Sequence, residues 1–135
     1  MGELIKITPD RIRAKSIFKM AMVSFEMIKT IDEKKFPSNV VKGYYDVIRE
    51  LISAIVLIDG YKTYGEGAHK KLIDYFFSEY KEFFSSEIFL VNELRILRNK
   101  IDYDGFFVKY EYLERKNVFI KDVIEKLIKL VEKKL

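Results

Sequence analysis

The sequence predicts an all-α protein, an up-and-down antiparallel bundle of four to five helices forming a single domain over residues 1–135. Apolar residues recur at the three- and four-residue spacings of amphipathic helices, and no segment of any length alternates as a strand does. Proline and glycine interrupt the helical segments at intervals that suit short connections. Hydrophobic residues make up 49% of the chain, which is enough for one core and argues against disorder.

The first predicted helix begins at Thr8-Pro9-Asp10, where a capping hydroxyl precedes a proline and an acid in the first turn. Its apolar residues keep a roughly helical spacing over the following turns. We expect it to end near residues 31–33, before the break at Phe36-Pro37-Ser38.

The second predicted helix is capped by Ser38 or Asn39 and runs to about Asp59, where Gly60 supplies a stop. Residues 51–58 are apolar almost all round the helix. We therefore expect it to be the central and most deeply buried helix of the bundle.

Residues 61–67 contain two glycines and are predicted to form a loop. A third helix follows over about residues 68–80. Ser85-Ser86-Glu87 caps a fourth helix that runs to about Tyr103, with Gly105 just beyond it. The fifth helix is long, over about residues 110–134, and a break near Asn117 is compatible with its pattern.

Composition restricts the classes of function. The chain has no cysteine and one histidine, His69, so we expect no disulfide, no metal site, no cysteine nucleophile and no cofactor. The longest apolar run, residues 54–58, is far too short to span a bilayer, and the N-terminal run is too short for a signal peptide. We expect a cytoplasmic protein without a membrane partner. Its charge of +4 fits nucleic-acid binding and an ordinary solvated surface equally well, and its Cys-free, Lys/Glu/Ile-rich composition is thermophile-like.

The fourth helix carries an unusual group of polar side chains beside its apolar stripe. A helical projection places the apolar residues on one narrow face and the polar group on one adjoining flank. The stripe is Leu90, Leu94, Leu97 and Ile101, and the flank is Asn92, Arg95, Arg98, Asn99 and Asp102. Arginine and asparagine side chains in such a cluster suit the bidentate binding of phosphate or carboxylate.

Simpler interpretations remain open for these candidates. Arg98 and Asp102 are four residues apart, so they can pair on the helix surface for a few tenths of a kcal/mol (about 0.3). His69 lies beside two lysines at the start of the third helix, which is more typical of a surface or capping residue than of a general base. Most aromatic residues have core spacing, and Phe106-Phe107 is the pair expected to be exposed or at an interface.

Several short motifs, in this order, resemble the HEPN family, the higher eukaryote and prokaryote nucleotide-binding domains. They are Gly43-Tyr44-Tyr45-Asp46-Val47-Ile48-Arg49-Glu50-Leu51, Leu57-Ile58-Asp59-Gly60-Tyr61-Lys62, Ala68-His69-Lys70, Leu97-Arg98-Asn99 leading into Tyr103-Asp104-Gly105, and Phe107-Val108 to Tyr112-Leu113-Glu114-Arg115. The last of these is similar to small archaeal members. Together they cover most of the chain from Asn39 onwards.

The resemblance implies a helical homodimer, an RNA- or nucleotide-binding or toxin–antitoxin role, and a minimal nucleotidyltransferase as partner. In the family, catalysis is tied to an arginine, a polar residue directly after it, and a histidine four to six residues further on. Arg98 and Asn99 match the first two positions, but Tyr103, Asp104 and Gly105 stand where the histidine would be. The hydroxyl of tyrosine ordinarily has a pKa of about 10, which is too high for efficient acid–base cleavage of RNA near neutral pH.

Three hypotheses follow. In the first, a HEPN-like dimer binds RNA, a nucleotide or a nucleotidyltransferase with weak or no catalysis, through Arg98 and Asn99 supported by Arg95, Asp102 and Tyr103. In the second, the protein is a metal-independent endoribonuclease toxin in which Tyr103 or His69 replaces the missing histidine. In the third, the polar flank only specifies pairing in a structural interaction module. On a regular helix Tyr103 lies about 140° from Arg98, so their convergence would require a distorted helix or a second subunit.

Overall fold

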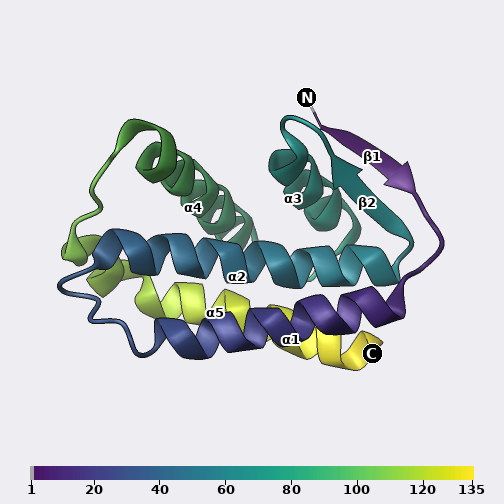
Figure 1. Ribbon diagram of the computed structural model, residues 1–135, viewed down its shortest axis with the longest axis horizontal. Helices are drawn as coiled ribbons and strands as arrows, with labels where there is room; N and C mark the ends of the chain where they lie inside the picture. The colour runs from purple at the N-terminus through teal and green to yellow at the C-terminus, as the bar shows by residue number, and fades with distance from the viewer. Residues whose placement is uncertain (1) are drawn as a thin grey trace.

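Helices dominate the computed structural model, which describes residues 2–135 and confirms the predicted all-α bundle (Figure 1). The two short strands in this part of the chain form one small sheet. The elements are β1 (Glu3–Lys6), α1 (Arg11–Ile28), α2 (Pro37–Ile58), β2 (Tyr61–Tyr64), α3 (Ala68–Glu79), α4 (Ser85–Asp104) and α5 (Tyr110–Lys134). The boundaries of α3, α4 and α5 lie close to those predicted from the sequence, whereas both ends of α1 and the start of α2 differ.

Helix α2 is the centre of the fold, as its apolar run predicted. It contacts α1, α3, α4 and α5, and all residues from Leu51 to Ile58 except Ser53 are buried. A side chain at Gly43 would place its Cβ 2.8 Å from Cγ1 of Ile28, so the glycine allows α1 and α2 to pack closely. None of the helices within residues 2–135 is long and apolar enough to cross a membrane.

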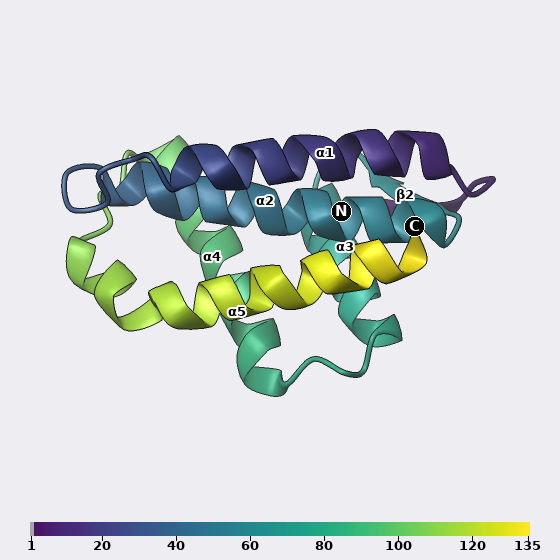
Figure 2. The ribbon, with the colours of Figure 1, turned by 90° about the horizontal axis from the view of Figure 1, so that it is seen from below.

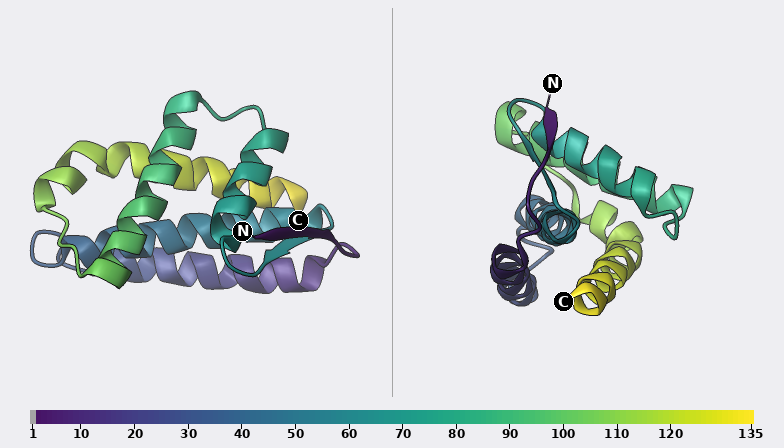
Figure 3. Two further views of the ribbon diagram at one scale, coloured as in Figure 1. Left: turned by 90° about the horizontal axis from the view of Figure 1, so that it is seen from above. Right: turned by 90° about the vertical axis from the view of Figure 1, so that its right-hand side faces the viewer.

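The helices are arranged in two directions. The long helices α1, α2 and α5 run side by side along the length of the molecule (Figure 2). The chain passes along α2 in the direction opposite to α1. Helices α3 and α4 lie together on one side of α2 and cross the long helices (Figure 3). This crossing brings the start of α3 beside the second half of α4, which sequence periodicity alone does not specify.

Several predicted helix starts are corrected. Asp10, not Thr8, caps α1, and its Oδ1 accepts a hydrogen bond from the backbone N of Arg13 at 3.0 Å. Thr8 and Pro9 belong to the connection after β1, because Ile7 donates to the carbonyl of Gly60. Helix α2 begins at Pro37, and Ser38 instead accepts a hydrogen bond from the backbone N of Val108.

The helix ends also differ in part. Helix α1 ends at Ile28, before the predicted residues 31–33, and Thr30 there bonds the carbonyl of Met27. Gly105 follows α4, as predicted. Its φ of 64° is the left-handed conformation in which glycine commonly ends a helix. Helix α5 is unbroken, and Asn117 bonds Glu33 rather than interrupting the helix.

Part of the predicted loop over residues 61–67 is a strand. Strand β2 pairs antiparallel with β1, with Glu3 opposite Tyr64 and Lys6 opposite Tyr61. Both strands have four residues, too few for a clear alternation, and they are more than fifty residues apart in the chain. The sheet therefore depends on a long-range contact that local pattern analysis cannot detect.

One polar cluster ties the C-terminal end of α5 to three other helices. Nζ of Lys134 lies 2.8 Å from Oδ1 of Asp59, at the end of α2. The hydroxyl of Tyr80, at the end of α3, donates to the other oxygen of that carboxylate. Arg11, at the start of α1, donates from Nη1 to the carbonyl of Lys134 at 2.7 Å.

We expect Lys134→Met to lower the free energy of unfolding by about 1 kcal/mol, because it removes a partly buried ion pair. Lys133→Met is a matched control, since Lys133 is exposed and makes no ion pair within residues 2–135. Urea unfolding followed by circular dichroism measures both. Equal losses in the two variants would show that the cluster does not stabilise the fold.

Candidate functional site

The predicted polar flank of α4 is present in the structure. Arg95, Asn99 and Tyr103 are spaced four residues apart and share one side of the helix, with Arg98 beside them. Leu90 and Leu94 are buried on the core side of α4. The core therefore fixes the rotation of α4 and presents the polar side chains away from it.

The start of α3 closes the site opposite this flank. A pocket of about 500 Å³ is lined by the loop and helix start at residues 65–69 and by Arg95, Arg98, Asn99 and Tyr103. His69 is half-buried and lines this pocket, a position that its sequence neighbours do not indicate. The reason is the crossing of α3 over α2, which places its first turn against α4.

Arg98 and Tyr103 line the same pocket although α4 is a continuous helix from Ser85 to Asp104. They share this pocket without a distortion of the helix, and the expectation that direct contact between them needs a distortion or a second subunit stays a prediction. The spacing does separate their Cα atoms round the helix, but both side chains are long. Tyr103 is 78% exposed and stands at the rim, while the Arg98 side chain is 21% exposed.

Asp102 holds Arg98 from behind the pocket. Its Oδ2 lies 3.1 Å from Nε of Arg98, and its Oδ1 lies 2.7 Å from Nζ of Lys42 on α2. The predicted pairing of Arg98 with Asp102 is thus confirmed. Asp102 is not among the residues that line the pocket. Its single negative charge is shared between Arg98 and Lys42, and it orients the Arg98 guanidinium rather than facing a ligand.

Three residues of α2 complete the site and were missed by the sequence analysis as site residues. Tyr45 is fully buried, and its ring centroid lies 6.0 Å from Cζ of Arg98 and 6.4 Å from the ring of His69. Arg49 lies in the same cluster, with Nη2 3.9 Å from Oδ1 of Asp46. In the sequence, Tyr45, Asp46 and Arg49 have the spacing of ordinary core and surface residues. Only the packing of α4 against α2 shows that they lie beside the site.

Unsatisfied buried polar atoms concentrate in this cluster. Within residues 2–135, six buried side-chain polar atoms have no hydrogen-bond partner, and five of them lie here. The five are Tyr45 Oη, Asp46 Oδ1, Arg49 Nε, Arg95 Nε and Arg98 Nε. Arg98 Nε and Asp46 Oδ1 do take part in ion pairs, with Asp102 and Arg49, whose geometry is not that of a hydrogen bond. Folded proteins satisfy nearly all buried polar groups, so such a concentration is typical of a functional site.

The arginines change the chemistry of His69. Burial lowers the pKa of His69 below its usual value of 6.5, and the positive charges of Arg49, Arg98 and Arg95 lower it further against the opposing effect of Asp46. His69 is therefore a neutral imidazole near neutral pH. Burial also raises the pKa of Tyr45 to about 12, although the arginines oppose the shift, so Tyr45 keeps its proton.

The charge of the pocket wall is positive. Arg95 and Arg98 line it against one acid, Glu66. Arg95 makes no ion pair with any other residue of 2–135, so its charge is available to a ligand. No three histidine or carboxylate side chains in the described chain converge as metal ligands. The arrangement suits an anion with several oxygens, since arginine donates in a planar fork.

Phe106 and Phe107, predicted to be exposed or at an interface, are both exposed, Phe107 at 85%. They follow Gly105 outside the pocket.

Comparison of the chain with known protein families, with curated proteins and with solved structures finds no match.

Stability should depend on pH through His69. The unfolded chain, with the usual pKa of 6.5, takes up a proton at a higher pH than the folded protein does. Stability from this residue is thus complete above 6.5 and falls as the pH falls through that value to the lowered pKa of the folded state. Urea unfolding across this range should show the decline, and His69→Gln should flatten it. An unchanged slope in the variant would contradict the assignment.

Proposed function

We propose that the protein binds the phosphate groups of RNA or of a nucleotide in the pocket between α3 and α4. The observation that carries this proposal is the convergence of Arg95, Arg98 and His69 on one pocket of about 500 Å³. Arg49 adds a third arginine charge close enough to act on His69. Arginine clusters of this kind bind phosphate through charge-assisted, bidentate hydrogen bonds.

The local geometry supports a phosphate in particular. The guanidinium of Arg95 makes no ion pair within residues 2–135. The guanidinium of Arg98 is already held by Asp102, so little side-chain entropy is lost when it binds a ligand. Helix α3 begins at Ala68 after its N-cap Gly67, and both residues line the pocket, so the positive end of that helix is beside the arginines. Helix end and arginines therefore favour the same negatively charged group.

Tyr103 distinguishes a nucleotide from a simple anion. Its ring is exposed at the rim of the pocket and offers a flat surface beside the phosphate-binding side chains. Bases stack on such rings with little sequence preference. Asn99, between Arg95 and Tyr103 on the same side of α4, supplies an amide for hydrogen bonds to the ligand.

This proposal agrees with what the HEPN resemblance implies, namely an all-helical domain that uses Arg98 and Asn99 toward nucleic acid. A toxin–antitoxin role and a nucleotidyltransferase partner follow from that resemblance alone and stay predictions.

Removal of either pocket arginine should weaken RNA binding. We expect Arg95→Ala and Arg98→Ala each to raise the Kd for a short single-stranded RNA by about tenfold, because each removes a charge-assisted contact. Each should also reduce the slope of log K against log salt by about 1. Fluorescence anisotropy at several salt concentrations measures both effects.

Arg115→Ala is the matched control, since Arg115 is an exposed arginine on α5. Arg95→Ala is the cleaner test, because loss of Arg98 also changes the environment of Asp102. Binding by both pocket variants that equals wild type would contradict the proposal. If Arg98→Ala instead kept its RNA affinity and lost only self-association, the structural interaction module would be favoured.

Metal-independent cleavage of RNA is the second candidate, supported by the position of His69. A neutral imidazole can take the proton from a ribose 2′-hydroxyl, which then attacks the neighbouring phosphorus. Arg95 and Arg98 would stabilise the charge on the phosphoryl oxygens. The bond to the 5′-oxygen breaks, and that oxygen takes a proton from water or from the hydroxyl of Tyr103, leaving a 2′,3′-cyclic phosphate.

Cleavage by this route should require His69 and should slow as the pH falls below its pKa. We expect His69→Gln to abolish formation of the cyclic phosphate while changing the Kd for RNA by less than about threefold, a split between chemistry and binding. Product analysis by gel electrophoresis with chelator present measures this. Equal cleavage by wild type and His69→Gln would assign the activity to another source.

A further inference from the structure

The outer side of helix α1 carries a row of exposed apolar side chains. The helix packs chiefly against α2, and its other side carries four apolar residues that are each more than half exposed: Ile12, Met20, Val23 and Met27. At about 100° per residue these four positions fall within a sector of about 80°. We call them the α1 stripe. Exposed apolar residues scattered singly are common on proteins, whereas residues gathered on one face mark an interaction surface.

The excess positive charge of the chain is concentrated beside this stripe. Residues 6–19 contain five lysine or arginine side chains and one acid, so their charge of +4 equals the net charge of the whole chain. The rest of the chain is therefore balanced in charge. The five cations are all exposed, and none makes an ion pair within residues 2–135. They are Lys6, Arg11, Arg13, Lys15 and Lys19.

Two of these cations border the stripe directly. On a regular helix, Lys19 lies about 20° beyond one edge of the stripe and Arg13 about 20° beyond the other. Lys15 is one turn before Lys19 on the same side. The acid of α1, Glu26, is paired with Lys29 at 3.0 Å. Because α1 runs along one edge of the molecule (Figure 2), the stripe and its cations can meet an extended surface together.

We propose that α1 binds the surface of an anionic phospholipid membrane. Apolar side chains flanked by lysine and arginine are the pattern of a helix that lies in the plane of the interface. The stripe would enter the boundary between headgroups and acyl chains, and the cations would lie on the lipid phosphates and carboxylates. Nucleic acid also attracts cations, but its phosphate backbone offers no apolar layer for the stripe.

The expectation of a protein without a membrane partner rests on the length of its apolar runs. A helix that lies on a membrane needs no run of spanning length. The lack of a spanning helix within residues 2–135 therefore does not bear on surface binding.

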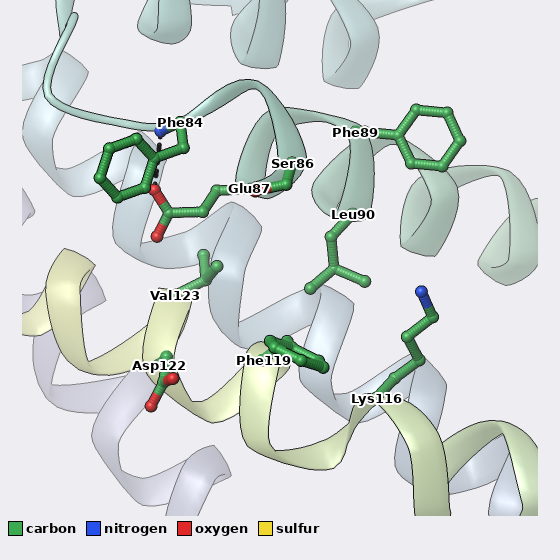
Figure 4. Close-up of a pocket in the computed structure, with 9 residues that line it drawn as sticks. All are labelled: Phe84, Ser86, Glu87, Phe89, Leu90, Lys116, Phe119, Asp122 and Val123. Atoms are coloured by element: carbon green, nitrogen blue, oxygen red, sulfur yellow. Dashed lines mark hydrogen bonds between the residues drawn. The ribbon is translucent and has the colours of Figure 1, made fainter.

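A second exposed apolar surface lacks the bias in charge and provides a comparison. A groove of about 490 Å³ between α4 and α5 is lined by the exposed rings of Phe84, Phe89 and Phe119 (Figure 4). Its charged lining residues have both signs: Glu87, Lys116 and Asp122. Apolar exposure without excess positive charge does not favour an anionic membrane, so this groove is the control surface.

The α1 stripe is also separate from the phosphate pocket. Helices α3 and α4, which form the pocket, lie on a different side of α2 from α1 (Figure 1). A membrane bound to α1 therefore leaves the pocket open. Membrane binding and RNA binding can be tested, and can fail, independently.

Vesicle flotation tests the proposal directly. We expect wild type to bind vesicles of phosphatidylcholine mixed equally with phosphatidylserine about tenfold more strongly than vesicles of phosphatidylcholine alone. Val23→Asp should lower binding to the mixed vesicles by about tenfold, because it places an acid within the stripe. Lys15→Gln and Lys19→Gln should each lower it by about fivefold. High salt should weaken wild-type binding, since it screens the cations.

Two matched controls come from other surfaces. Phe119→Asp places an acid in the α4–α5 groove, and Lys71→Gln removes an exposed lysine on α3 that makes no ion pair within residues 2–135. Both variants should bind the mixed vesicles as wild type does, and so should Arg95→Ala. Circular dichroism checks that each variant is folded.

Three results would overturn the proposal. They are a wild type that does not bind the mixed vesicles, equal binding to both kinds of vesicle, and a loss in Phe119→Asp as large as that in Val23→Asp. If Lys15→Gln and Lys19→Gln instead weakened RNA binding and kept vesicle binding, the cations beside α1 would serve nucleic acid, which also contradicts the proposal.

Discussion

Packing of the other four helices against α2 is the constraint on which the rest of the structure depends. Four helices pack against it, and its buried residues form most of the core. Helices α1 and α5 run along α2, whereas α3 and α4 share one side of it and cross it (Figure 3). That crossing, and not any local motif, places His69 beside Arg95 and Arg98.

The same packing sets the electrostatics of the site. Helix α2 supplies Tyr45 as the surface on which the Arg98 guanidinium lies, and Lys42 as a second cation on Asp102. Positive charges held together in a partly buried place repel one another, which raises the free energy of the free protein locally. A bound anion would reduce that repulsion, which is the physical basis of the proposed phosphate binding. The pKa of His69 is lowered chiefly by burial and further by the same arginine charges.

The sequence was sufficient for the helices and insufficient for their crossings. Amphipathic spacing located all five helices and the central place of α2, because each depends on local periodicity. The β1–β2 sheet was missed, since its strands are short and distant in the chain. Arg95, Arg98 and Asn99 were found because they interrupt an apolar helix. Arg49 and Tyr45 were not predicted as site residues, because the sequence of α2 does not indicate which residues of α4 pack against it. The place of His69 in this pocket was not predicted for the same reason.

The central claim is that the arginines around His69 bind phosphate, and the ring of His69 reports on it directly. His69 is the one histidine of the sequence, so its proton NMR titration is unambiguous. The pKa of the free protein should lie below 6.5. Saturation with a short single-stranded RNA should raise it, because a phosphate offsets the arginine charges. An RNA that binds and leaves the pKa of His69 unchanged would contradict this account.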